Sequence, residues 1–242
     1  MTLFSAGLDG VTFLSQGCRL VGGLYRAAGA TPRPSVILLH GLPGTEQNLD
    51  IAYGLRAAGI NCLFFHYRGC WGSAGVYNLA GLADDVRAAA DWLTAQPCVD
   101  PARLALVGYS LGGHLTLAAG AADPRYKALA ALCPLIDPAA QPLDAATFAE
   151  FAELLNGLTG AELQAQWAAL PPIPPLAGQL ARRPLLLVTA GQDAYFPPAH
   201  YQHFPGDLAS VTWWRFPTAD HVFSHDRPSL VQTIVGWLQK VL

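Results

Sequence analysis

A serine flanked by glycines lies in the stretch GYSLGG, which covers residues 108–113. The apolar run ARLALV precedes this stretch and the Ala- and Leu-rich run HLTLAAGAA follows it. Ser110 therefore stands where a strand should turn into a helix, and glycines at 108 and 112 suit such a turn because a side chain there would collide. The spacing favours a nucleophilic hydroxyl over an ordinary turn serine, although five-residue patterns also occur by chance.

A serine hydroxyl needs a base that removes its proton. Of the seven histidines, only His221 comes directly after the last predicted strand, in the short polar turn FPTADHVFS. It is the predicted base, and His225 is its rival. His114 is expected to pack inside the protein and His66 to end a strand. Surface positions are expected for three other histidines: His200, His203 and His225.

The base in turn needs a carboxylate that holds its ring in one tautomer and stabilises its charged form. Asp193 lies in the loop after the apolar run LLLVTA and is the predicted acid. Asp137, at the end of the preceding strand, is the alternative, and Asp220 is expected to point away from its neighbour His221. Any one aspartate could be a turn residue, but Ser110, Asp193 and His221 form an ordered set.

Hydrolysis through a serine also produces an oxyanion, which backbone N–H groups stabilise well because the fold already fixes them. One predicted donor is the N–H of Leu111, directly after Ser110 at the helix start. The other is the N–H of Leu42 in the loop HGLPGT. Pro43 has no N–H and is excluded.

Eight apolar runs are available to position these residues. From the third run onward, most are separated by helix-like segments, which is typical of an α/β protein with a mainly parallel sheet. Helices are predicted to begin near Thr45, Gly81, Ser110, Pro197 and Pro228. The runs are VTFLSQ, RLVGGLYR, SVILLH, INCLFFHY, RLALVGY, ALAALCPLI, PLLLVTAG and SVTWWRF.

A long connection interrupts this rhythm and predicts an insertion over 138–180 within one domain over 1–242. Its first part predicts two short helices parted around Asn156 and Gly157, and a proline-rich return follows them. Because the insertion leaves the sheet near Ser110, it is expected to form a small lid over the site. Its apolar stripe must cover the domain body, a second subunit or an acyl chain; the residues are Phe148, Phe151, Leu154, Leu155 and Leu158.

Aromatic residues near these loops could line a substrate pocket, although core packing is the commoner role of any single one. Two further aromatic residues, Trp213 and Trp214, are expected to face opposite sides of one strand. The pocket candidates are Trp71, Phe148, Phe151, Trp167, Tyr195 and Phe196.

Composition limits the classes of partner. The chain of 242 residues is 52% hydrophobic, only 13% charged, and has a formal net charge of -3. It thus offers no basic surface for nucleic acid, and a small-molecule substrate fits better. The five cysteines form no CxxC pair and predict free thiols in a reducing compartment. The start lacks a basic leader and no apolar run is long enough for a membrane, so the expected location is cytoplasmic.

Six segments resemble the serine hydrolases of the α/β-hydrolase superfamily. Within it, the chain is similar to the dienelactone-hydrolase-like and acyl-peptidase-like branch, which includes small bacterial esterases and feruloyl esterases. The resemblance implies an α/β-hydrolase fold with an eight-stranded sheet and no metal or organic cofactor. The segments are HGLPG at 40–44, HYRGCWGSAG at 66–75, DDVRAAADWL at 84–93, GYSLGG at 108–113, GQDAYFP at 191–197 and ADHVF at 219–223.

Some features depart from relatives in this superfamily. Ser110 stands where a true dienelactone hydrolase has cysteine and where haloalkane dehalogenases and epoxide hydrolases have aspartate. His66 stands in HYRG where relatives often have aspartate. The 242 residues leave no room for the propeller domain of prolyl-oligopeptidase-like enzymes, which weakens a peptidase role.

Three functions follow from these features. The first is a carboxylic ester hydrolase that acts on a small-molecule ester through an acyl-enzyme. The second is an aminopeptidase or acyl-peptide hydrolase, for which Glu150 or Glu153 would supply a carboxylate for the substrate amine. The third is a catalytically silent hydrolase fold that serves as a binding module. A homodimer is one way to cover the apolar stripe of the insertion.

Overall fold

The computed structural model describes residues 3–45, 48–140, 143–202, 204 and 209–242. In this part of the chain the strands form one sheet in the order β1-β2-β4-β3-β5-β6-β7-β8. The pairs β1–β2 and β2–β4 are antiparallel and the other pairs are parallel. The strands are β1 (Gly7–Ser15), β2 (Cys18–Arg26), β3 (Arg33–Leu39), β4 (Asn61–Phe65), β5 (Val99–Tyr109), β6 (Tyr126–Leu132), β7 (Leu185–Ala190) and β8 (Val211–Phe216).

All eight predicted apolar runs are strands, and the mainly parallel eight-stranded sheet is confirmed. The central strands β4 and β7 are buried at every position, as expected when helices cover both faces of a parallel sheet. The edge strand β8 alternates instead: Trp213 packs against the core and Trp214 is exposed. The two tryptophans therefore face opposite sides, as predicted.

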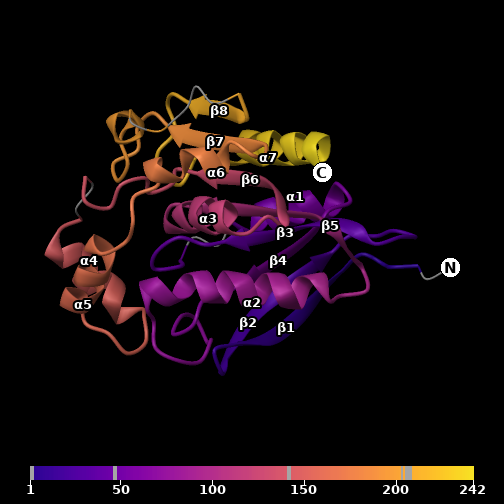
Figure 1. Ribbon diagram of the computed structural model, residues 1–242, viewed down its shortest axis with the longest axis horizontal. Helices are drawn as coiled ribbons and strands as arrows, with labels where there is room; N and C mark the ends of the chain where they lie inside the picture. Colours follow the sequence, from indigo (N-terminus) through magenta and orange to yellow (C-terminus); the bar gives the residue numbers. More distant parts are fainter. Residues whose placement is uncertain (1–2, 46–47, 141–142, 203, 205–208) are drawn as a thin grey trace.

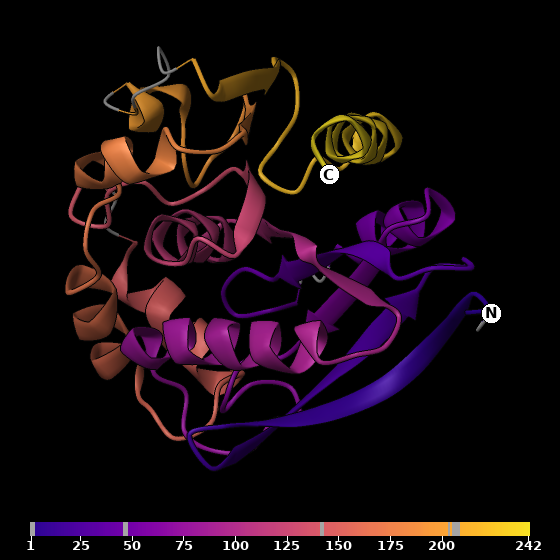
Figure 2. The same ribbon diagram turned by 45° about the vertical axis from the view of Figure 1, so that its right-hand side comes forward.

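Helices cover the two faces of the sheet (Figure 1 and Figure 2). Helices α2 (Leu82–Thr94) and α3 (Leu111–Ala122) pack their apolar residues into one core cluster, whereas α1 (Leu49–Ala57) and α7 (Arg227–Val241) pack into the cluster on the other face. The start expected near Pro197 leads only to a single 3-10 turn, η3 (Pro198–Tyr201), and another such turn, η1 (Leu79–Gly81), precedes α2.

The predicted insertion contains α4 (Ala145–Glu153), α5 (Gly160–Ala168), the 3-10 turn η2 (Pro174–Leu176) and the short α6 (Ala177–Leu180). Helices α4 and α5 part at Asn156 and Gly157 as expected, and the positive φ of Gly157 (82°) makes a glycine suitable there. The Asp144 side chain caps α4, and Thr159 with Glu162 forms a capping box on α5. Local capping thus fixes where both helices begin.

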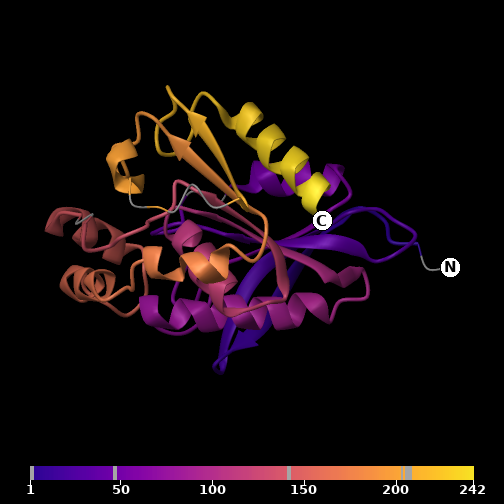
Figure 3. The same cartoon turned by 45° about the horizontal axis from the view of Figure 1, so that its top comes forward.

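Backbone hydrogen bonds fasten this insertion to the loop before α2. The N–H of Asn156 donates to the carbonyl of Gly69 at 2.7 Å, and the N–H of Tyr77 donates to the carbonyl of Asn156 at 2.9 Å. The pair α4–α5 lies at the end of the molecule opposite the C-terminus, beyond the carboxyl ends of the parallel strands (Figure 1 and Figure 3). The insertion therefore lies at the edge of the sheet where the candidate site is expected.

The stripe predicted on the insertion is split between two environments. Phe148 and Leu155 are buried, whereas Leu154 is 45% exposed. Leu154 follows the end of α4 and forms its C-cap, so the helical spacing that placed it in the stripe no longer applies there. Most of the stripe packs on the protein itself.

The thiols and helices bear on two further expectations. All five cysteines are free thiols, and only Cys18 is not fully buried. No helix in the described ranges is long and apolar enough to cross a membrane.

Candidate active site

Ser110 lies at a tight turn between β5 and α3, with φ 57° and ψ −117°. This conformation is strained for a residue with a side chain, and such strain is commonly found at functional sites. A Cβ atom at Gly108 would lie 2.0 Å from the carbonyl oxygen of Gly112, and one at Gly112 would lie 2.2 Å from that of Leu39. The glycine spacing thus has the steric cause that the sequence suggested.

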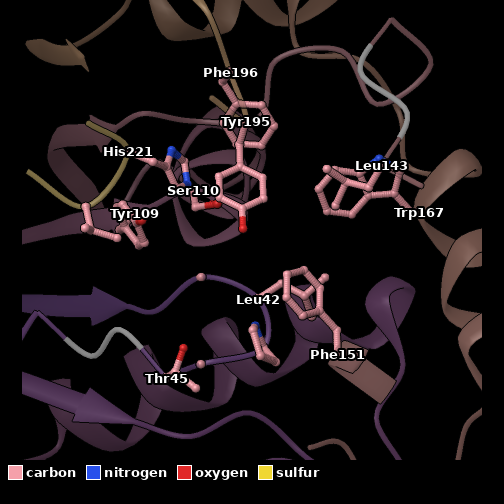
Figure 4. A pocket seen from close by; sticks show the side chains of 14 residues that line it. Leu42, Thr45, Tyr109, Ser110, Leu143, Phe151, Trp167, Tyr195, Phe196 and His221 are labelled. Atoms are coloured by element: carbon pink, nitrogen blue, oxygen red, sulfur yellow. The ribbon is translucent and has the colours of Figure 1, made fainter. Parts of the chain in front are cut away.

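The structure brings His221 and Asp193 into contact beside Ser110. Nδ1 of His221 and Oδ2 of Asp193 are 2.7 Å apart, and the Asp193 carboxyl group is fully buried. Because an ionised carboxylate only accepts hydrogen bonds, Nδ1 carries the proton and Nε2 keeps a lone pair. The His221 ring lies beside the Ser110 hydroxyl in Figure 4, and both residues line one cavity.

The second oxygen of Asp193 is held by the backbone. Oδ1 accepts hydrogen bonds from the N–H groups of Tyr195 at 2.9 Å and Phe196 at 2.8 Å. The rings of both aromatic residues also pack on the His221 imidazole, with centroids 5.0 and 5.2 Å away. The segment GQDAYFP therefore fixes both the acid and the orientation of the imidazole.

The other two aspartates bind elsewhere. Asp137 accepts a hydrogen bond from the N–H of Ala139 at 3.0 Å and shapes the turn after β6. Asp220 accepts from the N–H and the hydroxyl of Ser224, at 2.8 and 2.6 Å. Among the three aspartates considered, the structure brings only Asp193 to His221.

Cys133 is a neighbour of this acid that the sequence analysis missed. It is fully buried, adopts φ 40°, and its sulfur lies within 4.8 Å of a carboxylate oxygen of Asp193. Burial, with the Asp193 carboxylate as a second cause, raises the pKa of the thiol well above its ordinary value. Its place directly after β6, at the carboxyl edge of the sheet, was the signal that could have found it.

The other histidines differ from the prediction in which of them are buried and which are exposed. His114 is buried, and burial lowers its pKa to about 4. His200, expected at the surface, is instead half-buried: its Nε2 accepts the N–H of Ile136 at 2.7 Å, and burial lowers its pKa to about 4. That expectation was wrong because the turn η3 folds back onto the loop after β6. His225 is exposed, and His203 lies outside the described residues.

The predicted oxyanion donors come from two segments that meet at the cavity. Leu111 is the first residue of α3, so its N–H has no acceptor within the helix. Leu42 lines the cavity with Ser110. Next to Leu42, the Pro43 carbonyl accepts hydrogen bonds from the Trp71 indole N–H at 2.9 Å and the Cys70 thiol at 3.4 Å. The loop that carries Leu42 is therefore fixed from behind.

The cavity has a volume of about 140 Å³ and a mostly apolar lining. Four of the six pocket candidates line it, from the insertion and from the loop after β7: Phe151, Trp167, Tyr195 and Phe196. Leu143, which the sequence analysis did not name, joins them (Figure 4).

The other two pocket candidates lie outside this lining. Trp71 is 42% exposed and acts through its indole N–H, which binds the Pro43 carbonyl on the far side of the loop. Phe148 is 1% exposed and packs edge-to-face on Trp167, with ring centroids 5.8 Å apart. Trp71 therefore supports the loop, and Phe148 supports a lining residue from beneath.

Relatives of known sequence match part of the chain. An uncharacterized protein of Mycobacterium tuberculosis is 36% identical over 117 residues, which are 48% of this chain and 42% of that protein. The thiohydrolase apmlB of Arthrinium phaeospermum is 36% identical over 125 residues, which are 49% of this chain and 40% of that protein. The chain thus matches less than half the length of these relatives.

Solved structures match nearly the whole chain. Est1E from Butyrivibrio proteoclasticus, bound to ferulic acid, superimposes with a TM-score of 0.78 at 19% identity and covers 96% of this chain and 98% of its own. The Pyrococcus furiosus esterase Pf2001 gives a TM-score of 0.72 at 20% identity, with 97% and 91% covered. At such identities the likeness shows the fold, which is that of the α/β-hydrolases.

The sequence itself matches a family model. Residues 51–242, which include the elbow serine and the Asp193–His221 pair, match the model of the prolyl oligopeptidase family. The match spans most of the chain and agrees with the resemblance noted in its motifs. The chain belongs to the prolyl oligopeptidase family and is a hydrolase of the α/β-hydrolase superfamily.

Proposed function

We propose that this protein is a serine esterase that cleaves carboxylic esters through an acyl-enzyme. The observation that carries the proposal is the 2.7 Å contact between His221 and the buried Asp193, beside the strained Ser110 at one cavity. A hydroxyl, a base and an orienting acid in this arrangement can perform nucleophilic acyl transfer.

In the proposed first step, Nε2 of His221 takes the proton of Ser110 while Oγ bonds to the acyl carbon. The carbonyl oxygen becomes an oxyanion, which accepts hydrogen bonds from the N–H groups of Leu42 and Leu111. His221 then gives its proton to the departing alkoxide, so the alcohol leaves and the acyl-enzyme remains. Asp193 stabilises the imidazolium that exists between these transfers.

In the second step, water loses a proton to His221 and attacks the acyl carbon. Collapse of the second oxyanion breaks the bond to Oγ, and Ser110 regains the proton from His221. The products are one carboxylic acid and one alcohol, and the protein returns to its starting protonation state.

The charge of the cavity favours an ester over a peptide amine. Within the described residues, no side-chain carboxylate lines the cavity. Glu150 and Glu153, which an aminopeptidase role would need, are exposed on α4 and outside the lining. An uncharged, mostly apolar cavity suits an ester acyl group better than a substrate ammonium.

We also propose that 1–242 is one domain in which 138–180 acts as a small lid. Phe151 and Trp167 of the insertion line the cavity opposite His221, which supports a role in choosing the acyl group. The free, mostly buried thiols support a cytoplasmic location. Pairing of two chains remains a prediction.

The decisive experiment is a panel of acetate, longer-chain and aromatic esters on the purified protein, with Ser110→Ala as control. We expect ester turnover that the alanine variant lacks. Aminoacyl anilides test the peptidase alternative, and a thioester is included because one relative is named a thiohydrolase. Equal turnover by parent and variant would refute the mechanism, and no turnover of any substrate would favour the silent binding module.

A further inference from the structure

A second cluster of reactive side chains lies behind the loop that carries Leu42. One nitrogen each of His40 and His66 and the sulfur of Cys70 all lie within 4.8 Å of one another. His40 directly follows β3, His66 directly follows β4, and Cys70 lies in the next turn. We propose that these three side chains bind one zinc ion, which has no part in the proposed ester hydrolysis.

The imidazoles present unused nitrogen atoms to the protein interior. Nε2 of His40 and Nδ1 of His66 are buried and have no hydrogen-bond partner among the described residues. A buried polar atom without a partner costs about 1–3 kcal/mol, so such atoms call for an explanation. A cation that bound these two nitrogens would satisfy both of them.

The second nitrogen of His40 is arranged as in a metal-binding histidine. Nδ1 of His40 lies 2.7 Å from the carbonyl oxygen of Gly41 and donates its proton there. Consequently the lone pair remains on the unpartnered Nε2. Metal-ligating histidines almost always donate their other N–H to a carbonyl, a carboxylate or water in this way, which fixes the tautomer and the ring.

Cys70 supplies the third donor. Its thiol is 1% exposed and makes one long hydrogen bond, of 3.4 Å, to the Pro43 carbonyl. On zinc binding the thiol would lose its proton to solvent and form a zinc–sulfur bond, and the ion would keep a water as fourth ligand. Donor atoms on one tetrahedral zinc lie roughly 3.4–3.6 Å apart, so small side-chain rotations suffice to close the cluster.

The donor set selects the metal. Two imidazoles and one thiolate suit zinc, whereas magnesium and calcium prefer oxygen ligands. The backbone of His66 is also fixed, because its N–H donates to the Val21 carbonyl at 2.9 Å and its carbonyl accepts the Ser73 hydroxyl at 2.7 Å. The N–H of Cys70 donates to the Tyr67 carbonyl at 3.1 Å, so two of the ligands sit on hydrogen-bonded backbone.

An ion can reach the cluster from outside. His66 and Trp71 line an open groove over the β1–β2–β4 side of the sheet. Three glycines belong to the same lining, so little side-chain bulk obstructs it: Gly10, Gly22 and Gly23. The ion would enter through His66 and not through the substrate cavity, whose lining includes none of the three proposed ligands.

A second, competing cluster could also bind zinc, so the experiment must distinguish the two. Cys133, Asp193 and His221 also offer three donor atoms within 4.8 Å of one another. There, however, both Asp193 oxygens and the His221 Nδ1 already have hydrogen-bond partners. Zinc uptake must therefore be assigned to one cluster by substitution, since a loss of ester turnover alone would not separate the two.

The experiment measures metal binding to the full chain, so it does not depend on any ester substrate. Protein freed of metal is titrated with zinc against a chromophoric chelator and with cobalt(II), whose thiolate complex absorbs in the near ultraviolet. We expect one zinc per chain and the thiolate–cobalt band in the parent. Cys70→Ser, which keeps a hydroxyl for the Pro43 carbonyl, should lose the band, and His66→Gln should weaken zinc binding by at least about tenfold.

Two matched controls complete the design. Cys18→Ser removes a half-exposed thiol outside the cluster, and His221→Asn removes the histidine of the competing cluster. Both should bind zinc and show the band like the parent. Circular dichroism establishes that each variant is folded. If either Cys70→Ser or His66→Gln fails to fold, the other still tests the proposal. A parent that takes up no zinc, a band that persists in Cys70→Ser, or uptake lost only in His221→Asn would overturn the proposal.

Discussion

Ser110, Asp193 and His221 lie on short segments that follow strands of the sheet, whereas Phe151 and Trp167 lie on two short helices outside the sheet. The elbow has no room for a side chain at Gly108 or Gly112, where a Cβ would lie only 2.0 and 2.2 Å from backbone oxygens. The insertion is instead attached by hydrogen bonds around Asn156 and by apolar packing of side chains such as Phe148 and Leu155. The difference suggests that the segments following the strands carry the catalytic residues and that the insertion determines which acyl groups are preferred.

The largest effect should come from the nucleophile on the sheet side. Ser110→Ala is expected to lower kcat/KM for an acetate ester on the order of 10⁶-fold, and His221→Ala should cost a similar factor. The double variant should lose little more, because the members of a triad act as a unit. Steady-state and single-turnover assays measure this, with the exposed Ser229→Ala as control. If Ser110→Ala keeps near-parent turnover, Ser110 is not the nucleophile.

The acid should give the next largest effect. In Asp193→Asn the amide oxygen can still accept the N–H groups of Tyr195 and Phe196, which turns the amide NH₂ toward His221 and favours the wrong tautomer. We expect a loss of about 10⁴-fold in kcat. Asp137→Asn is the matched control and should stay near parent activity. The reverse result would move the acid to the loop after β6.

The stability of the protein should also depend on pH, because the fold buries histidines such as His114. Burial lowers the pKa of His114 to about 4, below the ordinary value of 6.5, so the unfolded chain takes up a proton first as pH falls. The stability that neutral His114 contributes is complete above about pH 6.5 and is lost progressively toward pH 4. At pH 5 the loss should be about 2 kcal/mol.

Urea unfolding at several pH values measures this effect. His114→Gln should unfold with a smaller change in free energy between pH 7 and pH 5 than the parent, while the difference between the two proteins should stay constant from pH 7 to pH 8. Parallel curves through the whole acid range would contradict the assignment to His114.

The sequence revealed the sheet and the elbow because both depend on local pattern. Apolar runs bounded by polar turns located all eight strands, and the glycine spacing around Ser110 is a local sequence motif, although the clash that excludes a side chain at Gly112 is with Leu39 of β3. Asp193 and His221 were found by a similar argument, since each follows a strand and the carboxyl ends of parallel strands share one edge. Such inferences need no knowledge of how distant segments pack.

What the sequence did not reveal depends on packing between distant segments. His200 was expected at the surface, but η3 brings it to the N–H of Ile136, 64 positions away in the chain. Cys133 contacts Asp193 from another strand end, and Trp71 turns its indole to Pro43 rather than to the cavity. Residue type and spacing cannot distinguish a lining residue from one that supports it from behind.

The smallest expected effect concerns the insertion and tests its role most directly. Phe151 lines the cavity from α4 and is only half-buried, so Phe151→Ala should leave the fold and the elbow intact. Loss of one remote contact should change the ratio of kcat/KM for a bulky aromatic ester to that for an acetate ester by several-fold, up to about tenfold. Turnover of the acetate ester itself should change little, because that substrate is too small to need the contact.

Leu154→Ala is the matched control for Phe151→Ala, since Leu154 follows the same helix, is 45% exposed and lies outside the cavity lining. If the control shifts the ratio as much as Phe151→Ala, the insertion acts through its general packing and not through the pocket. If neither shifts it, selection resides with Tyr195 and Phe196, which the sheet side supplies. In that case the segments that follow the strands would carry both the catalytic residues and the substrate preference, and the insertion would serve only to pack over the site.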